Sequence, residues 1–290
     1  RQIWYFRDQQ SYFLIQIAAV IDLLTFSSYS ATATIFAVLS FAGAWLFFRV
    51  FYDMLPEGHR WFAISSLFIP TVFFWGSVIY KDTLTLAALG ASMFLVYRIF
   101  VNRQMNVLYL AMVILCVLVI FSVKKYILLC FLPVIMIWLF SRILLGIRSM
   151  ALKIVVIPVS VAPVLALIYY ILLVVGENDE RYNMYSLAET AKMTAYDIRY
   201  GWGARTGEGS GYTLGELDGT WQSMLRLAVP AVNVSLFRPY LWEVKNPLML
   251  LSAVESFCVL LLTLFTLKVC QWRIVRYVSR PEVILCIGFS

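Results

Sequence analysis

The charged side chains of this sequence stand beside long apolar runs, and their types are suited to binding an anion. Residues 68–90, FIPTVFFWGSVIYKDTLTLAALG, place Lys81 and Asp82 side by side in an otherwise apolar stretch. Ammonium and guanidinium groups bind phosphate oxygens through charge-assisted hydrogen bonds. The candidate phosphate- or pyrophosphate-binding residues are Lys81, Lys124, Lys125 and Arg238. The alternative is that these cations are loop charges without a ligand.

Two carboxylates could act as a general base toward a hydroxyl nucleophile. Asp8 occurs in FRDQQSYF, and Glu243 follows Arg238 in LFRPYLWE. A carboxylate can accept the proton of a hydroxyl group that lies within hydrogen-bond reach. We therefore expect Asp8 or Glu243 to be the base, held near the cations.

The neighbours Lys81 and Asp82 also have a simpler structural interpretation. Asp82 can cap a helix that begins at Thr83, while the long side chain of Lys81 reaches the lipid headgroups. Adjacent residues on a helix do not face each other, so we expect no ion pair between the two. Pro70 predicts a kink in the preceding helix.

Glu255 is the carboxylate that is expected deepest in the membrane. It lies inside an apolar helix predicted to start after Asn246, about 13 Å deep at 1.5 Å per residue. A charge there costs a few kcal/mol unless it is paired or protonated. Glu255 is therefore either a protonated side chain that bonds a neighbouring helix or a group with a substrate or proton role.

Other chemistries find little support in the sequence. The chain has one histidine, His59, and five cysteines without a CxxC spacing, so neither a histidine-based metal site nor a histidine-based triad is available, and the cofactor stays open. A divalent metal does not follow from the residues. The net charge of +7 comes mostly from short loops between apolar runs, which indicates membrane topology rather than a nucleic-acid partner.

The composition predicts that membrane-spanning helices position these groups. Of 290 residues, 62% are hydrophobic and 13% are charged, and the mean hydropathy is +0.84. A soluble domain carries about 25% charged residues. Several continuous apolar runs approach the ~20 residues that span a bilayer as a helix. The sequence therefore predicts an all-α, polytopic bundle of about seven to eight transmembrane spans.

The apolar runs divide the chain into three parts. We expect an N-terminal bundle over 1–175, a long loop over 176–246 and C-terminal helices over 247–290, with both ends of the chain cut from a longer protein. Residues 11–26 are apolar but short, and we expect them at the membrane interface. The predicted spans lie near residues 29–50, 61–80, 83–100, 105–123, 126–142, 154–175 and 247–268, with an incomplete one from 282.

Basic residues in the short loops predict the orientation. Lys81, Lys124, Lys125 and the loop 176–246 fall on the face that is poor in basic residues, which the positive-inside rule makes extracytoplasmic. The opposite, cytoplasmic face is predicted to hold Arg49, Arg60, Arg98, Arg103, Arg142, Arg148, Lys153, Lys268, Arg273, Arg276 and Arg280.

The long loop combines a helical stripe with a glycine-rich segment. Apolar residues recur at helical spacing over 184–198, which predicts an amphipathic helix on the membrane surface. Residues 201–219 then hold seven of the 14 glycines. Because no phosphate-binding GxxxxGK[ST] motif is present, we interpret this segment as a lid or linker.

Two segments together resemble a known group of membrane enzymes. The stretch FIPTVFFWGSVIYKDTLTLAALG resembles a proline-aromatic-Trp-Gly/Ser-Lys-Asp segment of GT-C-type integral-membrane glycosyltransferases and of related O-antigen-polymerase-like proteins. LFRPYLWEVKNPLMLLSAVES resembles a segment that opens a late helix in members of that group. The two stretches cover about 45 residues, and the likeness in spans extends over most of the chain.

The resemblance implies an enzyme of bacterial surface-polysaccharide synthesis that lies in the bacterial inner membrane and acts on undecaprenyl-linked sugars at the extracytoplasmic face. Such enzymes use an acidic residue of their first outer loop as base, often near a metal, and only Asp8 could hold that place here. The paired acidic residues typical of that loop are not seen around Asp8. Phosphate binding would carry over to Lys81, Lys124 and Arg238.

We therefore predict a glycosyltransferase or polysaccharide polymerase whose substrate is a polyprenyl-phosphate-linked sugar. One alternative is a transporter or flippase for a lipid-linked or anionic solute, with Glu255 as its titrating group. Another is a non-catalytic membrane scaffold, in which the outer cations have no ligand.

Overall fold

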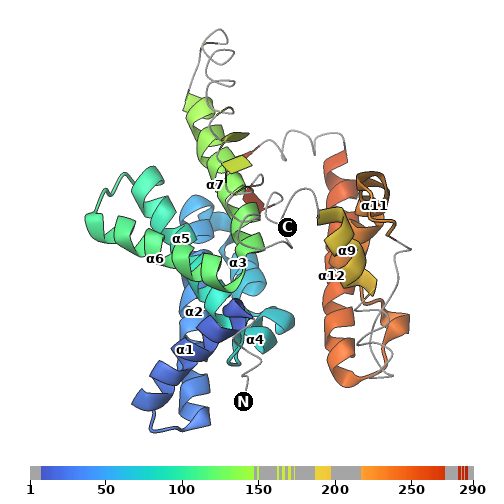
Figure 1. Cartoon of the computed structure of the whole chain (residues 1–290). Coiled ribbons are helices and arrows are strands. Elements are labelled where there is room, and N and C mark those ends of the chain that lie inside the picture. The colour runs from blue at the N-terminus through green and yellow to red at the C-terminus, as the bar shows by residue number, and fades with distance from the viewer. Residues whose placement is uncertain are drawn as a thin grey trace. The chain divides into compact units, whose positions relative to one another are not determined.

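The computed structural model describes residues 8–146, 187–196 and 217–271, with single residues of 149–173 and 280–286. These residues form helices and connecting segments, with no β-strand among them. The chain divides into two compact units, Arg1–Gly146 with Arg276–Ser290 and Ile147–Val275, which we call the first and the second unit (Figure 1). The domain boundaries predicted at 175 and 246 stay predictions.

The helices of the first unit follow one another with short connections. They are α1 (Gln9–Leu24), α2 (Tyr29–Met54), η2 (Pro56–Gly58), α3 (His59–Leu67), α4 (Pro70–Gly76), α5 (Lys81–Val96), the π-helical turn η3 (Tyr97–Val101), α6 (Val107–Val123) and α7 (Lys125–Gly146). The described helices of the second unit are α9 (Leu187–Tyr196), α11 (Trp221–Phe237), η6 (Leu241–Glu243) and α12 (Pro247–Cys270).

Four helices of the described residues are long and apolar enough to cross a membrane. Two shorter apolar helices, α1 and α6, accompany them. The predicted spans at 154–175 and from 282 fall largely outside the described residues. The four membrane-length helices cover Tyr29–Met54, Lys81–Val101, Lys125–Leu144 and Pro247–Cys270.

The segment predicted as a single span over 61–80 is instead two short helices. α3 ends at Leu67 and α4 starts at Pro70, with Ile69 in an extended conformation between them. Proline lacks an N–H group and disfavours helical geometry in the residue before it. Pro70 therefore breaks this helix instead of only kinking it.

α2 and α5 pack through glycines that bring their backbones into contact. A β-carbon at Gly90 would lie 1.9 Å from the Gly43 carbonyl oxygen, and a β-carbon at Gly43 would lie 2.4 Å from the Ala87 Cα atom. Only residues without a side chain allow this approach. Farther along both helices, Val50 and Tyr97 lie in one buried cluster. Because the contacts advance in the same order, the two helices run parallel.

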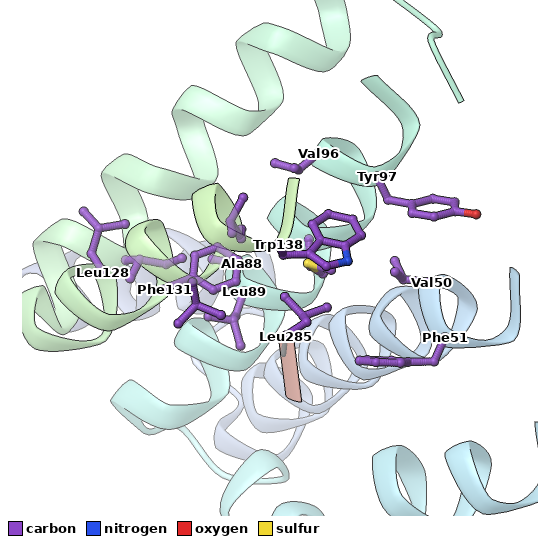
Figure 2. Close-up of a cluster of buried hydrophobic side chains, with 14 residues drawn as sticks. Val50, Phe51, Ala88, Leu89, Val96, Tyr97, Leu128, Phe131, Trp138 and Leu285 are labelled. Carbon is purple, nitrogen blue, oxygen red and sulfur yellow. The ribbon is translucent and has the colours of Figure 1, made fainter. Parts of the chain in front are cut away.

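The buried core of the first unit joins α7 to this helix pair. Trp138 of α7 is fully buried, as are Val50 and Met93. Figure 2 shows the Trp138 indole among these side chains, near Tyr97 and Leu285, which belong to the same cluster. In a bilayer, close packing of this kind holds helices together, since lipid is as apolar as the side chains.

The start of α5 differs from the predicted one. The helix begins at Lys81 with Tyr80 as its N-cap, so Asp82 stands in the first turn and is not the cap of a helix from Thr83. The preceding turn is held by Thr83, whose fully buried hydroxyl lies within hydrogen-bond distance of two backbone carbonyls, including that of Trp75 at 3.2 Å. Asp82 is therefore available to a partner elsewhere in the fold.

Thr83→Val is expected to destabilise the first unit by about 1–3 kcal/mol, because it removes the buried hydroxyl that donates to the part-buried carbonyls of the preceding turn. The substitution keeps the side-chain shape, so packing changes little. Thermal unfolding in detergent measures the effect. The matched control is Thr34→Val, which removes an exposed hydroxyl that bonds the Ser30 carbonyl at 2.8 Å. Equal melting temperatures for the two variants would contradict the assignment.

The second unit confirms one predicted helix start. Asn246 caps α12 by accepting a hydrogen bond from the Met249 amide (2.7 Å), and Pro247 occupies the first helical position. α9 confirms part of the predicted amphipathic helix over 184–198. The glycine-rich segment lies almost entirely outside the described residues.

Candidate functional site

Four charged residues from three segments of the first unit form two ion pairs at the start of α5. Lys81 Nζ lies 3.2 Å from Asp8 Oδ2, and Lys124 Nζ contacts Asp82 Oδ1. Asp8 precedes α1, and Lys124 lies between α6 and α7. We call Asp8, Lys81, Asp82 and Lys124 the ion-pair cluster.

The geometry of a helix explains why Lys81 and Asp82 are neighbours in the sequence without being partners. Successive side chains on a helix point about 100° apart. Lys81 therefore reaches the segment before α1, while Asp82 reaches the segment between α6 and α7. The prediction that these two residues do not pair with each other is confirmed. Together they connect three separate parts of the chain.

Asp8 has further partners that fix its carboxylate. Its oxygens accept hydrogen bonds from the backbone amides of Gln10 (3.2 Å) and Ser11 (3.3 Å), as an N-cap does, and also from the Ser11 hydroxyl. Burial alone would raise the pKa of Asp8, but the bonds from Ser11 and Lys81 outweigh it, and the pKa lies below its usual value. Asp8 is thus ionised at neutral pH although half of its side chain is exposed.

Lys124 is the more enclosed cation of the cluster, with 16% of its side chain exposed. Burial on its own would lower the pKa of Lys124, but the bond to Asp82 and the contact with Tyr126 outweigh it, and the pKa lies above its usual value. The Nζ atom also lies 5.9 Å from the centre of the Tyr126 ring. Lys124 is therefore charged throughout the neutral range.

The Asp8–Lys81 pair is expected to keep its charged Asp8 carboxylate at every pH above about 5 in the neutral range. Because the pKa of folded Asp8 is lowered from 3.8, its contribution to stability is present above that pH and is lost as the pH falls below it. For so exposed a pair we expect only about 0.2–1 kcal/mol. The difference in melting temperature between wild type and Asp8→Asn should be constant in the neutral range. Its loss between about pH 5 and pH 7 would contradict this.

Lys125 is directed differently from Lys124. Its Nζ atom lies 5.5 Å from the centre of the Phe121 ring on α6, a cation–π distance. The two adjacent lysines thus have different aromatic neighbours. The role predicted for Lys125 in phosphate binding stays a prediction.

In the second unit, Arg238 and Glu243 form a two-bond ion pair. Arg238 Nε and Nη2 lie 2.7 and 2.6 Å from the Glu243 carboxylate oxygens, and the Tyr240 amide donates to the same carboxylate at 3.2 Å. The bonds from Arg238 are the largest of the causes that lower the pKa of Glu243. Glu243 could therefore accept a proton as a base only after Arg238 releases it.

Glu255 is half-buried on α12, the helix that follows the Arg238–Glu243 ion pair in the sequence. Its neighbour Ser256 donates a hydrogen bond to the Arg238 carbonyl (3.1 Å), which ties α12 to the segment before η6. Whether Glu255 has a substrate or proton role stays a prediction.

The structure brings the predicted residues together in pairs that the sequence did not indicate. Each candidate base contacts one candidate phosphate-binding cation, Asp8 with Lys81 and Glu243 with Arg238. Lys124 joins Lys81 in the ion-pair cluster through Asp82. Arg238 belongs to the other unit, so its expected closeness to these lysines stays a prediction. Sequence reasoning missed Asp82 as a partner of Lys124.

Within the part of the chain that the structure describes, no three or more His, Cys, Asp or Glu side chains are grouped so that they could hold a metal ion. Comparisons of the chain with protein-family models, curated proteins and solved structures find no match.

Proposed function

We propose that this protein is a membrane glycosyltransferase or polysaccharide polymerase that acts on a polyprenyl-phosphate-linked sugar at the extracytoplasmic face. The observation that carries the proposal is the contact between Asp8 and Lys81, 3.2 Å apart. It supports a site in which a base and a phosphate-binding cation are neighbours from distant parts of the chain. Lys124 supplies a second cation to the same site.

Substrate binding would exchange the partner of Lys81. An exposed ion pair contributes about 0–1 kcal/mol, so a phosphate with several charged oxygens can displace a single carboxylate. Phosphate on Lys81 would release Asp8 from that cation and remove one cause of its lowered pKa. Donor binding would in this way raise the basicity of the group that must accept a proton.

The transfer step then follows from these roles. The hydroxyl oxygen of the acceptor forms a bond to the anomeric carbon of the donor sugar, and its proton passes to the Asp8 carboxylate. The bond between that carbon and the phosphate oxygen breaks, and its electron pair leaves with the polyprenyl phosphate. Lys81 and Lys124 stabilise the charge of this leaving group.

The parallel packing of α2 and α5 supports the topology of the proposal. If both helices cross the bilayer in the same direction, the chain must return between them. α3 and α4 are the helical segments available for that return, and broken helices occur in membranes where they are covered by protein. The start of α5, with the ion-pair cluster, would then lie on the extracytoplasmic side, opposite to Arg49 and Arg98.

Asp8→Asn is expected to lower the transfer rate by about 10²–10⁴-fold, the range of a general base. Purified protein in nanodiscs, supplied with a polyprenyl-phosphate-linked sugar and an acceptor glycan, gives the rate. Glu255→Gln tests the transporter alternative in the same experiment. The transporter requires a titrating group at this position, and the transferase does not. Full transfer by Asp8→Asn, or loss of solute uptake confined to Glu255→Gln, would refute the proposal.

A further inference from the structure

We propose that Arg49, Arg98 and Arg142 bind one phosphate group at the end of the first unit remote from the ion-pair cluster. The three residues come from α2, η3 and α7, so they are distant in sequence. We call them the arginine cluster. The proposal is independent of the transferase function.

The shared core places the three arginines at one end of the helix bundle. Figure 2 shows the core residues Val50, Tyr97 and Trp138 near one another, and all three belong to one buried cluster. In the sequence, Arg49 adjoins Val50, Arg98 adjoins Tyr97, and Arg142 lies one helical turn beyond Trp138. Tyr97 also interacts electrostatically with Arg98 and Arg142, and with Asp53 of α2. The three arginines are therefore attached to neighbouring positions of the same core cluster.

Each arginine has a buried donor without an acceptor. The Nε atoms of Arg49 and Arg98 and one terminal nitrogen of Arg142 have no hydrogen-bond partner among the described residues. None of the three takes part in an ion pair there. Buried polar groups nearly always have a partner. Three such donors on converging elements indicate a missing acceptor with several oxygens.

Aromatic stacking holds two of the guanidinium groups in place. The Arg98 guanidinium lies 5.1 Å from the centre of the Phe94 ring, and that of Arg142 lies 5.8 Å from the Trp138 ring. Stacked guanidinium groups keep their donor edges available for bidentate binding. Arg98 also donates to Gln104 at 3.2 Å.

The charge of the region suits a phosphate. Three arginines with Asp53 leave two positive charges, counted from the sequence. A phosphate carries one or two negative charges and accepts bidentate bonds from arginine. Membrane topology alone would require only basic residues near the helix ends, not half-buried guanidinium groups with unmatched donors. The group could belong to an anionic phospholipid headgroup or to free phosphate.

Lipid titration of the detergent-purified full chain tests the site. Short-chain phosphatidylglycerol is expected to raise the melting temperature in a saturable manner, and phosphatidylcholine of the same chain length is not. Arg142→Gln and Arg98→Gln should each weaken the apparent affinity at least about tenfold, because each removes a charged, bidentate donor. Arg60→Gln, at an exposed position of α3, is the matched control and should respond as wild type.

The outcomes separate the possible sources of the phosphate. If inorganic phosphate alone produces the same Arg142-dependent rise, the ligand is free phosphate, and if only phosphatidylglycerol does, it is a lipid headgroup. An equal effect of phosphatidylcholine, or equal affinities of Arg142→Gln and Arg60→Gln, would overturn the proposal. Should Arg142→Gln not fold, Arg142→Lys keeps the charge without the forked donor. Wild-type affinity in Arg142→Lys would overturn the proposal as well.

Discussion

Lys81→Met is expected to lower sugar transfer from a polyprenyl-linked donor by at least about a hundredfold, while the protein still accumulates in the membrane. Methionine keeps the length of the side chain and removes the charge that would hold the donor phosphate. Since Lys81 is partly exposed and its ion pair is weak, the fold should tolerate the change. Transfer in nanodiscs and the amount of surface glycan in cells measure the effect.

Kinetic constants separate a phosphate-binding role of Lys81 from a role in positioning Asp8. A cation that binds the donor should raise KM for that donor when it is lost, whereas loss of the base Asp8 should lower kcat. Lys81→Arg should restore part of the activity because it keeps the charge. Lys245→Ala, at an exposed position of the second unit, is the control. If Lys81→Met and Asp8→Asn change kcat alone and equally, Lys81 only positions Asp8.

Gly90→Leu is expected to prevent accumulation of the folded protein almost completely. Even a β-carbon at this position would lie 1.9 Å from the Gly43 carbonyl oxygen, and that atom belongs to a helix backbone that cannot rotate away. The cost should exceed the ~1–3 kcal/mol typical of overpacked cores. Gly90→Ala should already reduce accumulation, since it adds the same β-carbon. Quantitative blotting of membrane fractions and thermal unfolding report the loss.

The matched control for Gly90→Leu is Ala42→Leu. Ala42 neighbours Gly43 on α2 but faces away from α5, because its side chain is exposed. Leucine there should be accepted by the lipid, so the variant should accumulate as wild type. Equal amounts of Gly90→Leu and wild type would show that α2 and α5 do not pack as described.

Local signals in the sequence predicted much of the helical structure. Continuous apolar runs indicated α2, α6, α7 and α12, and Asn246 with Pro247 marked the start of α12. The same kind of signal failed over 61–80, where hydropathy favoured one helix and Pro70 broke it in two. α11 lies in the long loop over 176–246, where only the helix over 184–198 was predicted at a definite position.

The sequence indicated the charged residues of the site but not their partners. Asp82 looked like a helix cap because capping is a local pattern, whereas its bond to Lys124 spans 42 positions of the chain. The role of Thr83 could not be predicted from the sequence, because nothing in the neighbouring residues shows that its hydroxyl is buried. Pairing depends on how α1, α5 and α6 pack, and residue type carries no information about that.

The ion-pair cluster contains two positive and two negative side chains, so its net charge is zero. Its field decays quickly with distance, and salt screens what remains beyond about 8–10 Å. Such a surface does not draw anions from bulk water. For the proposed function this favours a lipid-linked donor, which is already confined to the plane of the bilayer and diffuses in two dimensions until its headgroup touches Lys81.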